Sequence, residues 1–89
     1  MGYGRTDLIV SPNPVINGTV NLQLTNLVRG KYFIRMFNSV GQQLLNRSMD
    51  HPGGSTTEIL NLPANVNRGI YFVQLTNGQS RLNKKVVVN

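Results

Sequence analysis

Few side chains in this sequence are suited to acid–base or nucleophilic chemistry, and the best-placed of them surround His51. Asp50 precedes the histidine, and Ser48 and Ser55 lie on either side of the pair, so the residue types of a hydrolytic triad are present. Such a triad needs a rigid scaffold that holds nucleophile, base and carboxylate within hydrogen-bonding distance. Here the candidates lie in or beside the loop that Gly53-Gly54 predicts. The sequence therefore indicates no catalytic residues and no enzyme.

Metal, cofactor and phosphate sites are not indicated either. One histidine and three acidic residues do not fill a metal coordination shell. The chain has no cysteine, so it has neither thiolate chemistry nor a disulfide framework. Each glycine begins or ends an expected strand, and none belongs to a glycine-rich phosphate loop. We therefore expect no metal and no cofactor.

One segment of the sequence partly matches a nucleic-acid-binding motif. Arg68-Gly69-Ile70-Tyr71-Phe72-Val73 follows in part the strand on which RNA-recognition modules stack bases. Ile70, however, stands where the motif has an aromatic residue, and Tyr71 where it has a small one. That fold also needs two amphipathic helices, which the sequence lacks. An RNA-binding module is the weaker alternative.

The charge of the chain is positive and unevenly spread. The formal net charge is +6, and Glu58 is the last acidic residue, whereas Arg68, Arg81, Lys84 and Lys85 follow it. A basic C-terminal third fits an anionic partner such as nucleic acid, lipopolysaccharide phosphate or an acidic receptor. It equally fits a soluble surface that is kept away from zero charge.

The elements that would position any site are short strands. Val20, Leu22 and Leu24 alternate with polar residues, which is typical of a half-buried strand. The expected strands cover residues 8–10, 20–25, 31–38, 42–49, 58–62, 69–76 and 81–88. Only residues 42–49 compete as a helix. Residues 50–55 are expected to form only a loop, and Asn77-Gly78 predicts a hairpin. Seven strands separated by turns indicate an all-β sandwich or barrel.

One pattern occurs twice. Residues 30–36 and 69–75 share the order Gly-x-Tyr-Phe-aliphatic-x-aliphatic. We expect Tyr32 and Tyr71 to bury their rings while each hydroxyl bonds backbone in the preceding corner, as in immunoglobulin-like sandwiches. Phe33 and Phe37 fall on the face opposite Tyr32, which predicts that this strand is covered on both sides.

The length of the chain and its first residues limit the domain organisation that can be expected. A chain of 89 residues forms one domain at most. We assign residues 7–89 to this domain, and residues 1–6 to an artificial start at Met1-Gly2 and a linker from an upstream domain. No apolar run approaches the length of a transmembrane helix. The first residues do not form a signal peptide, so we expect any export signal to lie upstream.

Several landmarks follow one another in a characteristic order. They are Ser11-Pro12-Asn13-Pro14 with Gly18, Met36-Phe37-Asn38 with Gly41, Leu60-x-Leu62-Pro63, Arg68-Gly69-Ile70-Tyr71-Phe72-Val73, Asn77-Gly78, and Lys84-Lys85-Val86-Val87-Val88. From about residue 8 to residue 89, the chain resembles the C-terminal sorting domain (type A) of type IX secretion system cargo proteins, which occur in Gram-negative bacteria. Ser11 stands where that family often has Tyr, and Asn38 where Asp is common.

The resemblance implies an immunoglobulin-like antiparallel β-sandwich of about seven strands that serves as a non-catalytic secretion signal. Its partners would be the cargo domain upstream in the same chain, the outer-membrane translocon and a sortase-like peptidase that removes the domain. The cargo would pass through the periplasm to the cell surface or the medium, without nucleic acid and without insertion into the membrane. The expected recognition residues are Pro12, Asn13, Pro14, Gly18, Gly41, Gly69, Tyr71, Lys84, Lys85, Val86 and Val87.

A structural or ligand-binding immunoglobulin-like accessory domain is the alternative. Sugar binding favours exposed aromatic residues, yet the chain has no Trp, and only Tyr3 lies clearly outside an expected strand.

Two of these segments carry specific expectations. Pro12-Asn13-Pro14 should be a rigid corner and a recognition surface, because its prolines fix φ and little entropy is lost on binding. Residues 84–89 should form the last strand, at an edge. There Lys84 and Lys85 would point to opposite faces, either to be read by the translocon or to discourage unwanted strand pairing.

Overall fold

Strands form wherever the sequence alternates between apolar and polar residues. The computed structural model describes residues 6–11, 18–64 and 66–89. It contains β1 (Asp7–Ser11), β2 (Thr19–Leu27), β3 (Gly30–Asn38), β4 (Gln43–His51), β5 (Gly54–Asn61), β6 (Gly69–Thr76) and β7 (Arg81–Val88). No helix occurs in the described part of the chain, so the RNA-recognition fold is not adopted, and no described helix is long and apolar enough to cross a membrane.

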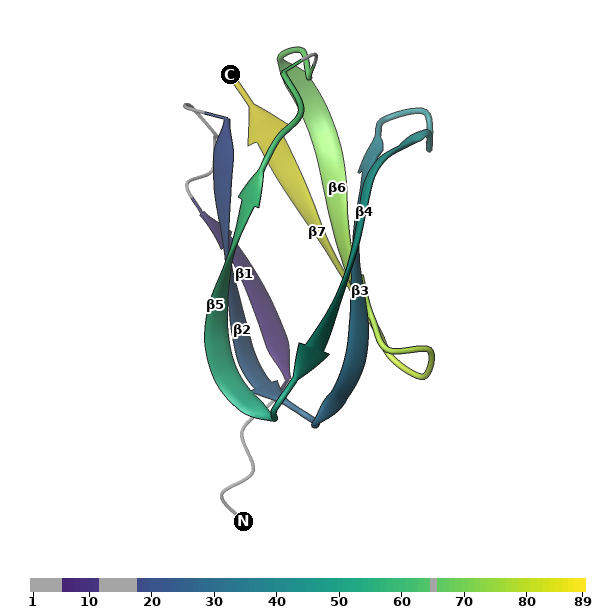
Figure 1. Cartoon of the computed structure of the whole chain (residues 1–89). Helices are drawn as coiled ribbons and strands as arrows, with labels where there is room; N and C mark the ends of the chain where they lie inside the picture. The colour runs from purple at the N-terminus through teal and green to yellow at the C-terminus, as the bar shows by residue number, and fades with distance from the viewer. Residues whose placement is uncertain (1–5, 12–17, 65) are drawn as a thin grey trace.

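The seven strands form two antiparallel sheets that pack as a sandwich (Figure 1). One sheet has the order β1-β2-β5 and the other the order β4-β3-β6-β7. β4 thus pairs with β3, as the C′ strand does in immunoglobulin variable domains. The predicted all-β sandwich is confirmed, and the barrel alternative is excluded because the sheets are separate.

The core lies between the sheets and is built by the inward-facing residues. Those that the period-two pattern predicted are all buried: Val20, Leu22, Leu24, Tyr32, Ile34, Met36, Tyr71, Val73 and Leu75. Fully burying one aliphatic side chain contributes roughly 1.5–3 kcal/mol. The pattern therefore identified the residues that hold the two layers together.

Three connections cross from one sheet to the other, and an aromatic side chain fixes each of them. At the β2–β3 crossing, the Tyr32 hydroxyl donates to the Val28 carbonyl oxygen at 2.6 Å. At the β5–β6 crossing, the Tyr71 hydroxyl donates to the Asn67 carbonyl oxygen, also at 2.6 Å. Both expected tyrosine corners are confirmed.

The third crossing corrects the prediction for residues 50–55. β4 continues through His51 and β5 begins at Gly54, so only Pro52 and Gly53 remain between strands. His51 is buried. Its Nδ1 accepts a hydrogen bond from the Gly53 N–H at 2.9 Å, which leaves Nε2 to donate to the Thr56 hydroxyl at 2.8 Å. Positive φ at both Gly53 and Gly54 (94° and 90°) allows the chain to reverse this tightly. The glycine-rich composition of residues 50–55 correctly predicted a turn. It did not indicate that β4 and β5 extend into this segment.

The strand assignments also test three smaller predictions, which concern residues 42–49, the Asn77-Gly78 hairpin and the outer face of β3. Residues 42–49 lie mainly in β4, so the helix alternative is excluded. The hairpin at Asn77-Gly78 forms with four loop residues rather than two. In that loop, Asn77 Oδ1 accepts hydrogen bonds from the N–H groups of Gln79 and Ser80, at 2.9 and 2.8 Å. The prediction that β3 is covered on both sides is wrong. Phe33 and Phe37 are only half-buried, because they lie on the outer face of a two-layer sandwich.

Candidate recognition end of the sandwich

Most of the described landmarks gather at one end of the molecule, whereas the Asn77-Gly78 hairpin lies at the other. Figure 1 shows the end of β1, the start of β2, the β3–β4 turn and the end of β5 at the same end of the molecule as the C-terminus, with the start of β1 at the other end. The contacts agree, because the Leu62 N–H donates to the Gly18 carbonyl oxygen at 2.8 Å, and Gly69 lies opposite Val88 in the sheet. We call this region, formed by Gly18, 38–42, 62–64, 66–69 and 86–88, the C-terminal end.

The β3–β4 turn at this end is held by the Asn38 side chain together with two backbone hydrogen bonds between Asn38 and residues 41 and 42. Asn38 Oδ1 accepts from the N–H groups of Val40 and Gln42 at 3.1 and 2.9 Å, and Asn38 Nδ2 donates to Gln42 Oε1 at 3.0 Å. Gly41 completes the turn with φ 87°, a conformation that other residues adopt only with strain. Gly41 thus shapes this loop.

The β5–β6 connection is fixed from inside the molecule. Tyr71 is buried, and its hydroxyl is bound to the Asn67 carbonyl oxygen. Tyr71 also lies opposite both Asn38 and Val86 in its sheet. Its ring is therefore enclosed. Tyr71 could affect a partner only indirectly, through the conformation of the corner that its hydroxyl holds. Pro12, Asn13 and Pro14 lie outside the described residues.

The two C-terminal lysines point to different faces of an edge strand, as expected. Lys84 lies opposite Val73 and so shares the inward-facing side of β7 with the buried Val86. Its Nζ is 3.7 Å from Asp7 Oδ1. Lys85 and Val87 lie on the outward-facing side. The position of β7 at the sheet edge is confirmed.

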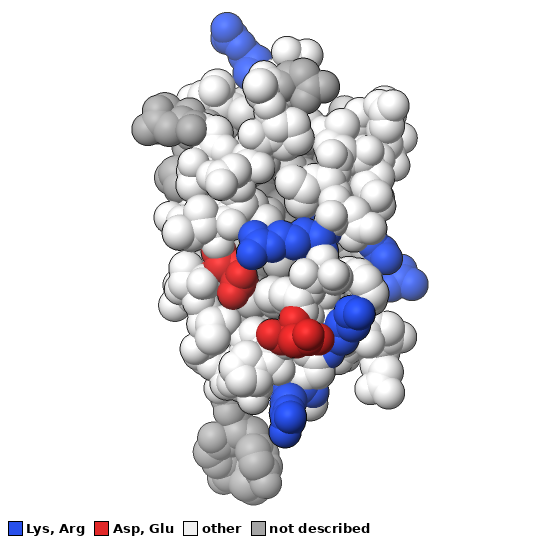
Figure 2. All heavy atoms as spheres, viewed as in Figure 1, with Lys and Arg blue, Asp and Glu red and all other residues white. Residues whose placement is uncertain are grey.

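Ion pairs join the two sheets along both sides of the sandwich. The Lys84–Asp7 pair connects β7 with β1. On the other side, Arg47 of β4 lies 3.3 Å from Glu58 of β5 and also donates to the Ile59 carbonyl oxygen at 3.0 Å. On the face shown in Figure 2, acidic and basic side chains lie beside one another in the middle of the molecule. All four strands are sheet edges, where charged residues also oppose unwanted pairing.

Sequence reasoning missed a group of apolar side chains on the outer face of the four-stranded sheet. Phe37, Ile70, Phe72 and Val87 lie there, and Phe72 is 39% exposed although it was expected in a strand core. The signal was present, since the apolar Ile70 and Phe72 alternate with Tyr71 and Val73. Only Tyr71 and Val73 face inward, so Ile70 and Phe72 must lie on the outer face.

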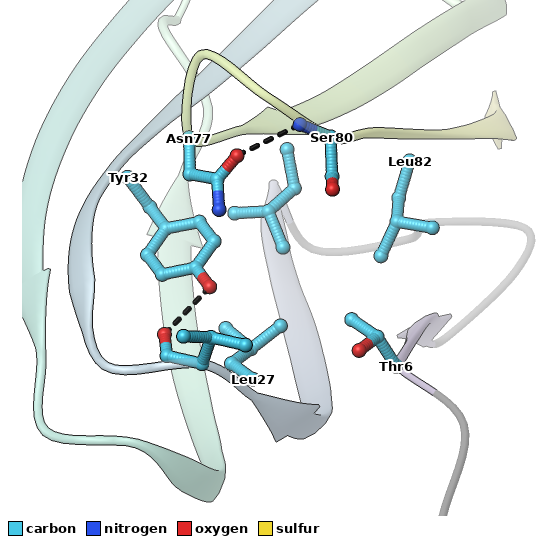
Figure 3. Close-up of a pocket in the computed structure, with 8 residues that line it drawn as sticks. Thr6, Leu27, Tyr32, Asn77, Ser80 and Leu82 are labelled. Carbon is cyan, nitrogen blue, oxygen red and sulfur yellow. Dashed lines mark hydrogen bonds between the residues drawn. The ribbon is translucent and has the colours of Figure 1, made fainter.

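The pocket shown in Figure 3 lies at the opposite end of the sandwich and offers little to a ligand. It measures about 200 Å³ and is lined by Thr6, Leu27, Val28, Tyr32, Leu75, Asn77, Ser80 and Leu82. Ligand pockets usually exceed about 300 Å³. The Tyr32 hydroxyl and Asn77 Oδ1 are bound to neighbouring backbone rather than directed into the space. Within the described residues, no group of three or more potential metal ligands lies together.

A family model described as the secretion system C-terminal sorting domain matches residues 10–89, a span that contains every landmark from Ser11 onward. No curated protein matches the chain.

Proposed function

Because the chain belongs to the family of secretion system C-terminal sorting domains, which mark exported proteins for type IX secretion, we propose that its C-terminal end is read by the outer-membrane translocon. In this proposal, a folded cargo precedes the domain and waits in the periplasm. After passage, a sortase-like peptidase removes the domain, and the cargo remains at the cell surface or in the medium.

The observation that carries the proposal is the separation between the two ends of the sandwich. The chain enters β1 at one end, and the turns at Gly18, Gly41 and Gly69 and the end of β7 lie at the other (Figure 1). A cargo attached upstream therefore leaves these turns open to a partner. Sorting by recognition requires such an arrangement, because the cargo is already folded when it is read.

The recognition residues would then act in two ways. Gly18, Gly41 and Gly69 shape the loops of the C-terminal end, all with positive φ. Lys85 and Val87 present side chains on the outer face of β7, while the buried Val86 anchors the strand beneath them. The domain is thus a substrate of the machinery, and sorting domains of this family are non-catalytic.

Cleavage is proposed to occur upstream of β1. A peptidase needs an extended chain that it can reach, and from Asp7 onward the residues of β1 are paired with β2. We therefore place the cut within residues 1–6 or in the segment that would precede them in a fusion.

The test is a fusion of this chain to the C-terminus of a folded periplasmic reporter, in a bacterium that has the type IX system. We expect the reporter outside the cell and shortened by the mass of the domain. In a strain without the translocon, it should stay in the periplasm at full length. Equal amounts of reporter in the medium of both strains would refute the proposal.

A further inference from the structure

Apolar side chains from three strands meet on the outer face of the four-stranded sheet. Phe37 lies directly opposite Phe72, and Ile70 lies directly opposite Val87. Neighbouring strands are about 4.8 Å apart, so these four side chains form one continuous group. Lys85, which lies opposite Phe72, borders it. We call these five residues the outer-face patch.

This group differs from the other exposed apolar residues of the domain. Ile70 and Phe72 are 47% and 39% exposed. Ile9 and Ile59, on the outer face of the other sheet, are similarly exposed at 46% and 55%. They belong, however, to the two edge strands of that sheet, and the polar β2 residues lie between them. Single exposed apolar residues need no explanation, whereas a contiguous group marks an interaction site.

The charges around the outer-face patch indicate what chemistry it would accept. Lys85 belongs to the patch, and Arg35, two residues from Phe37 on β3, adjoins it. Lys31 and Arg81 also face outward but lie toward the other end of the sheet, where Asp50, the one acidic residue in the described part of this face, lies opposite Lys31. Arg35 covers the ring of Phe33 at 5.3 Å. A second copy of the domain would bring like charges together, which opposes association. A partner with carboxylates would be attracted.

The extent of the patch favours a protein partner over a membrane or a sugar. Asn46, Ser48, Gln74 and Asn83 occupy other outward positions of the same sheet, and Arg35 lies over the ring of the outward-facing Phe33. The contiguous apolar area is therefore confined to one end and is too small to enter a bilayer. Its aromatic residues are both phenylalanines, which offer no hydrogen bond to a carbohydrate. Protein interfaces, by contrast, have an apolar centre with a polar rim.

We propose that the outer-face patch docks a protein segment of the export machinery that carries apolar side chains and at least one carboxylate. The segment's apolar side chains cover Phe72 and Ile70, and its carboxylate pairs with Lys85. The patch adjoins the C-terminal end through Gly69, Val87 and the β3–β4 turn, so one partner contacts both. The proposal rests on the sorting function proposed above and specifies a surface for it.

The first experiment replaces both exposed residues by a residue that preserves strand propensity. Ile70→Thr with Phe72→Thr is compared with Ile9→Thr and Ile59→Thr, which remove a similar apolar area from the other sheet. Each pair is placed in the reporter fusion, and the thermal midpoint of the isolated domain is measured in parallel. We expect export to slow about tenfold for the first pair, equivalent to ~1.4 kcal/mol of lost interaction, and less than about twofold for the control.

The charge is tested separately, and so is direct contact. Lys85→Glu should slow export, whereas Arg29→Glu, the same charge change at the opposite end, should not. A photo-crosslinking phenylalanine analogue at position 72 keeps the side chain nearly unchanged, so it remains informative if the threonine pair fails to fold. It should crosslink to a component of the secretion machinery that is identified by mass spectrometry. The analogue at position 59 should not.

Each result decides the proposal. If the unaltered fusion is exported but both threonine pairs are exported at the same rate, the outer-face patch is not a docking surface, and the sorting function stands. If the unaltered fusion is not exported, the sorting function itself fails. Crosslinks at position 72 to a second copy of the domain, or equal crosslinks from positions 59 and 72, would also overturn the proposal.

Discussion

Tyr32 and Tyr71 form the same hydrogen bond at opposite ends of one strand pair. Each hydroxyl donates to the carbonyl oxygen four residues earlier, at 2.6 Å in both cases, and each ring is buried. Tyr71 lies opposite Asn38, six residues along β3 from Tyr32, so the two corners are about 20 Å apart at ~3.3 Å per strand residue. Together they fix both crossings from the three-stranded to the four-stranded sheet.

The two corners should contribute independently to stability. Tyr32→Phe and Tyr71→Phe each remove one hydroxyl and leave a carbonyl oxygen without that partner, which should cost about 1–2 kcal/mol. Because the sites are far apart, the losses in the double variant should add to within about 0.5 kcal/mol. Urea unfolding followed by circular dichroism measures all three. Losses below about 0.3 kcal/mol would show that the bonds are incidental.

Core and outer-face positions should respond very differently to truncation. Leu22 is fully buried between the sheets, so Leu22→Ala should lower the free energy of unfolding by about 3 kcal/mol. The Ile59 side chain is 55% exposed, so Ile59→Ala removes fewer buried contacts. It should lower the free energy of unfolding by less than about 1 kcal/mol. Equal urea midpoints for the two variants would contradict the assigned core.

Lys84 should protect the edge of β7 more than it stabilises the fold. Its ion pair with Asp7 is roughly half exposed, and such pairs contribute about 0–1 kcal/mol. Lys84→Val should therefore leave the urea midpoint nearly unchanged, yet increase self-association, because an inward-facing charge on an edge strand opposes strand pairing. Light scattering over a concentration series is the measurement, with Lys84→Gln as the polar control. If the Lys84→Val variant stays monomeric, Lys84 does not protect the edge of β7 from strand pairing.

The Pro12-Asn13-Pro14 segment should matter more for export than for folding. Pro12→Ala with Pro14→Ala loosens the backbone and raises the entropy lost on binding. We expect the export of the reporter to fall while the melting temperature changes little. Unchanged export together with a lowered melting temperature would make the segment purely structural.

Local sequence patterns determined most of the fold. The alternation in residues 20–25, 31–38 and 69–76 identified both the strands and their buried faces, because burial on one side of a strand imposes a period of two. The repeated glycine–tyrosine pattern identified the corners, since a tyrosine at the start of a core strand bonds within four residues of itself. These signals are local, which is why the sequence reveals them.

What the sequence concealed depends on contacts between distant strands. Arg47 has a polar neighbourhood in sequence, yet it lies on the inward side of β4, where Glu58 of the other sheet meets it. His51 ends a strand because Thr56 and Gly53 bond its ring, which the glycine-rich composition around it did not indicate. The outer-face patch exists only because Phe37, Ile70, Phe72 and Val87 come together in register.

The C-terminal strand is part of the hydrophobic core as well as part of the proposed sorting signal. Val86 and Val88 are buried core residues, so deletion of residues 84–89 would remove part of the core along with any recognition signal. A loss of export after that deletion would not separate misfolding from lost recognition. The decisive variant must obstruct the C-terminal end while the sandwich stays intact.

Attaching a small folded domain after Asn89 through a flexible linker does this, and the same domain inserted between reporter and residue 1 is the matched control. The measurement is the fraction of folded reporter outside the cell, with the melting temperature of each fusion as the check on folding. We predict that the C-terminal addition abolishes export at an unchanged melting temperature, while the upstream insertion is tolerated. Equal export of the two fusions would contradict the claim that the C-terminal end of this sandwich is what the translocon reads.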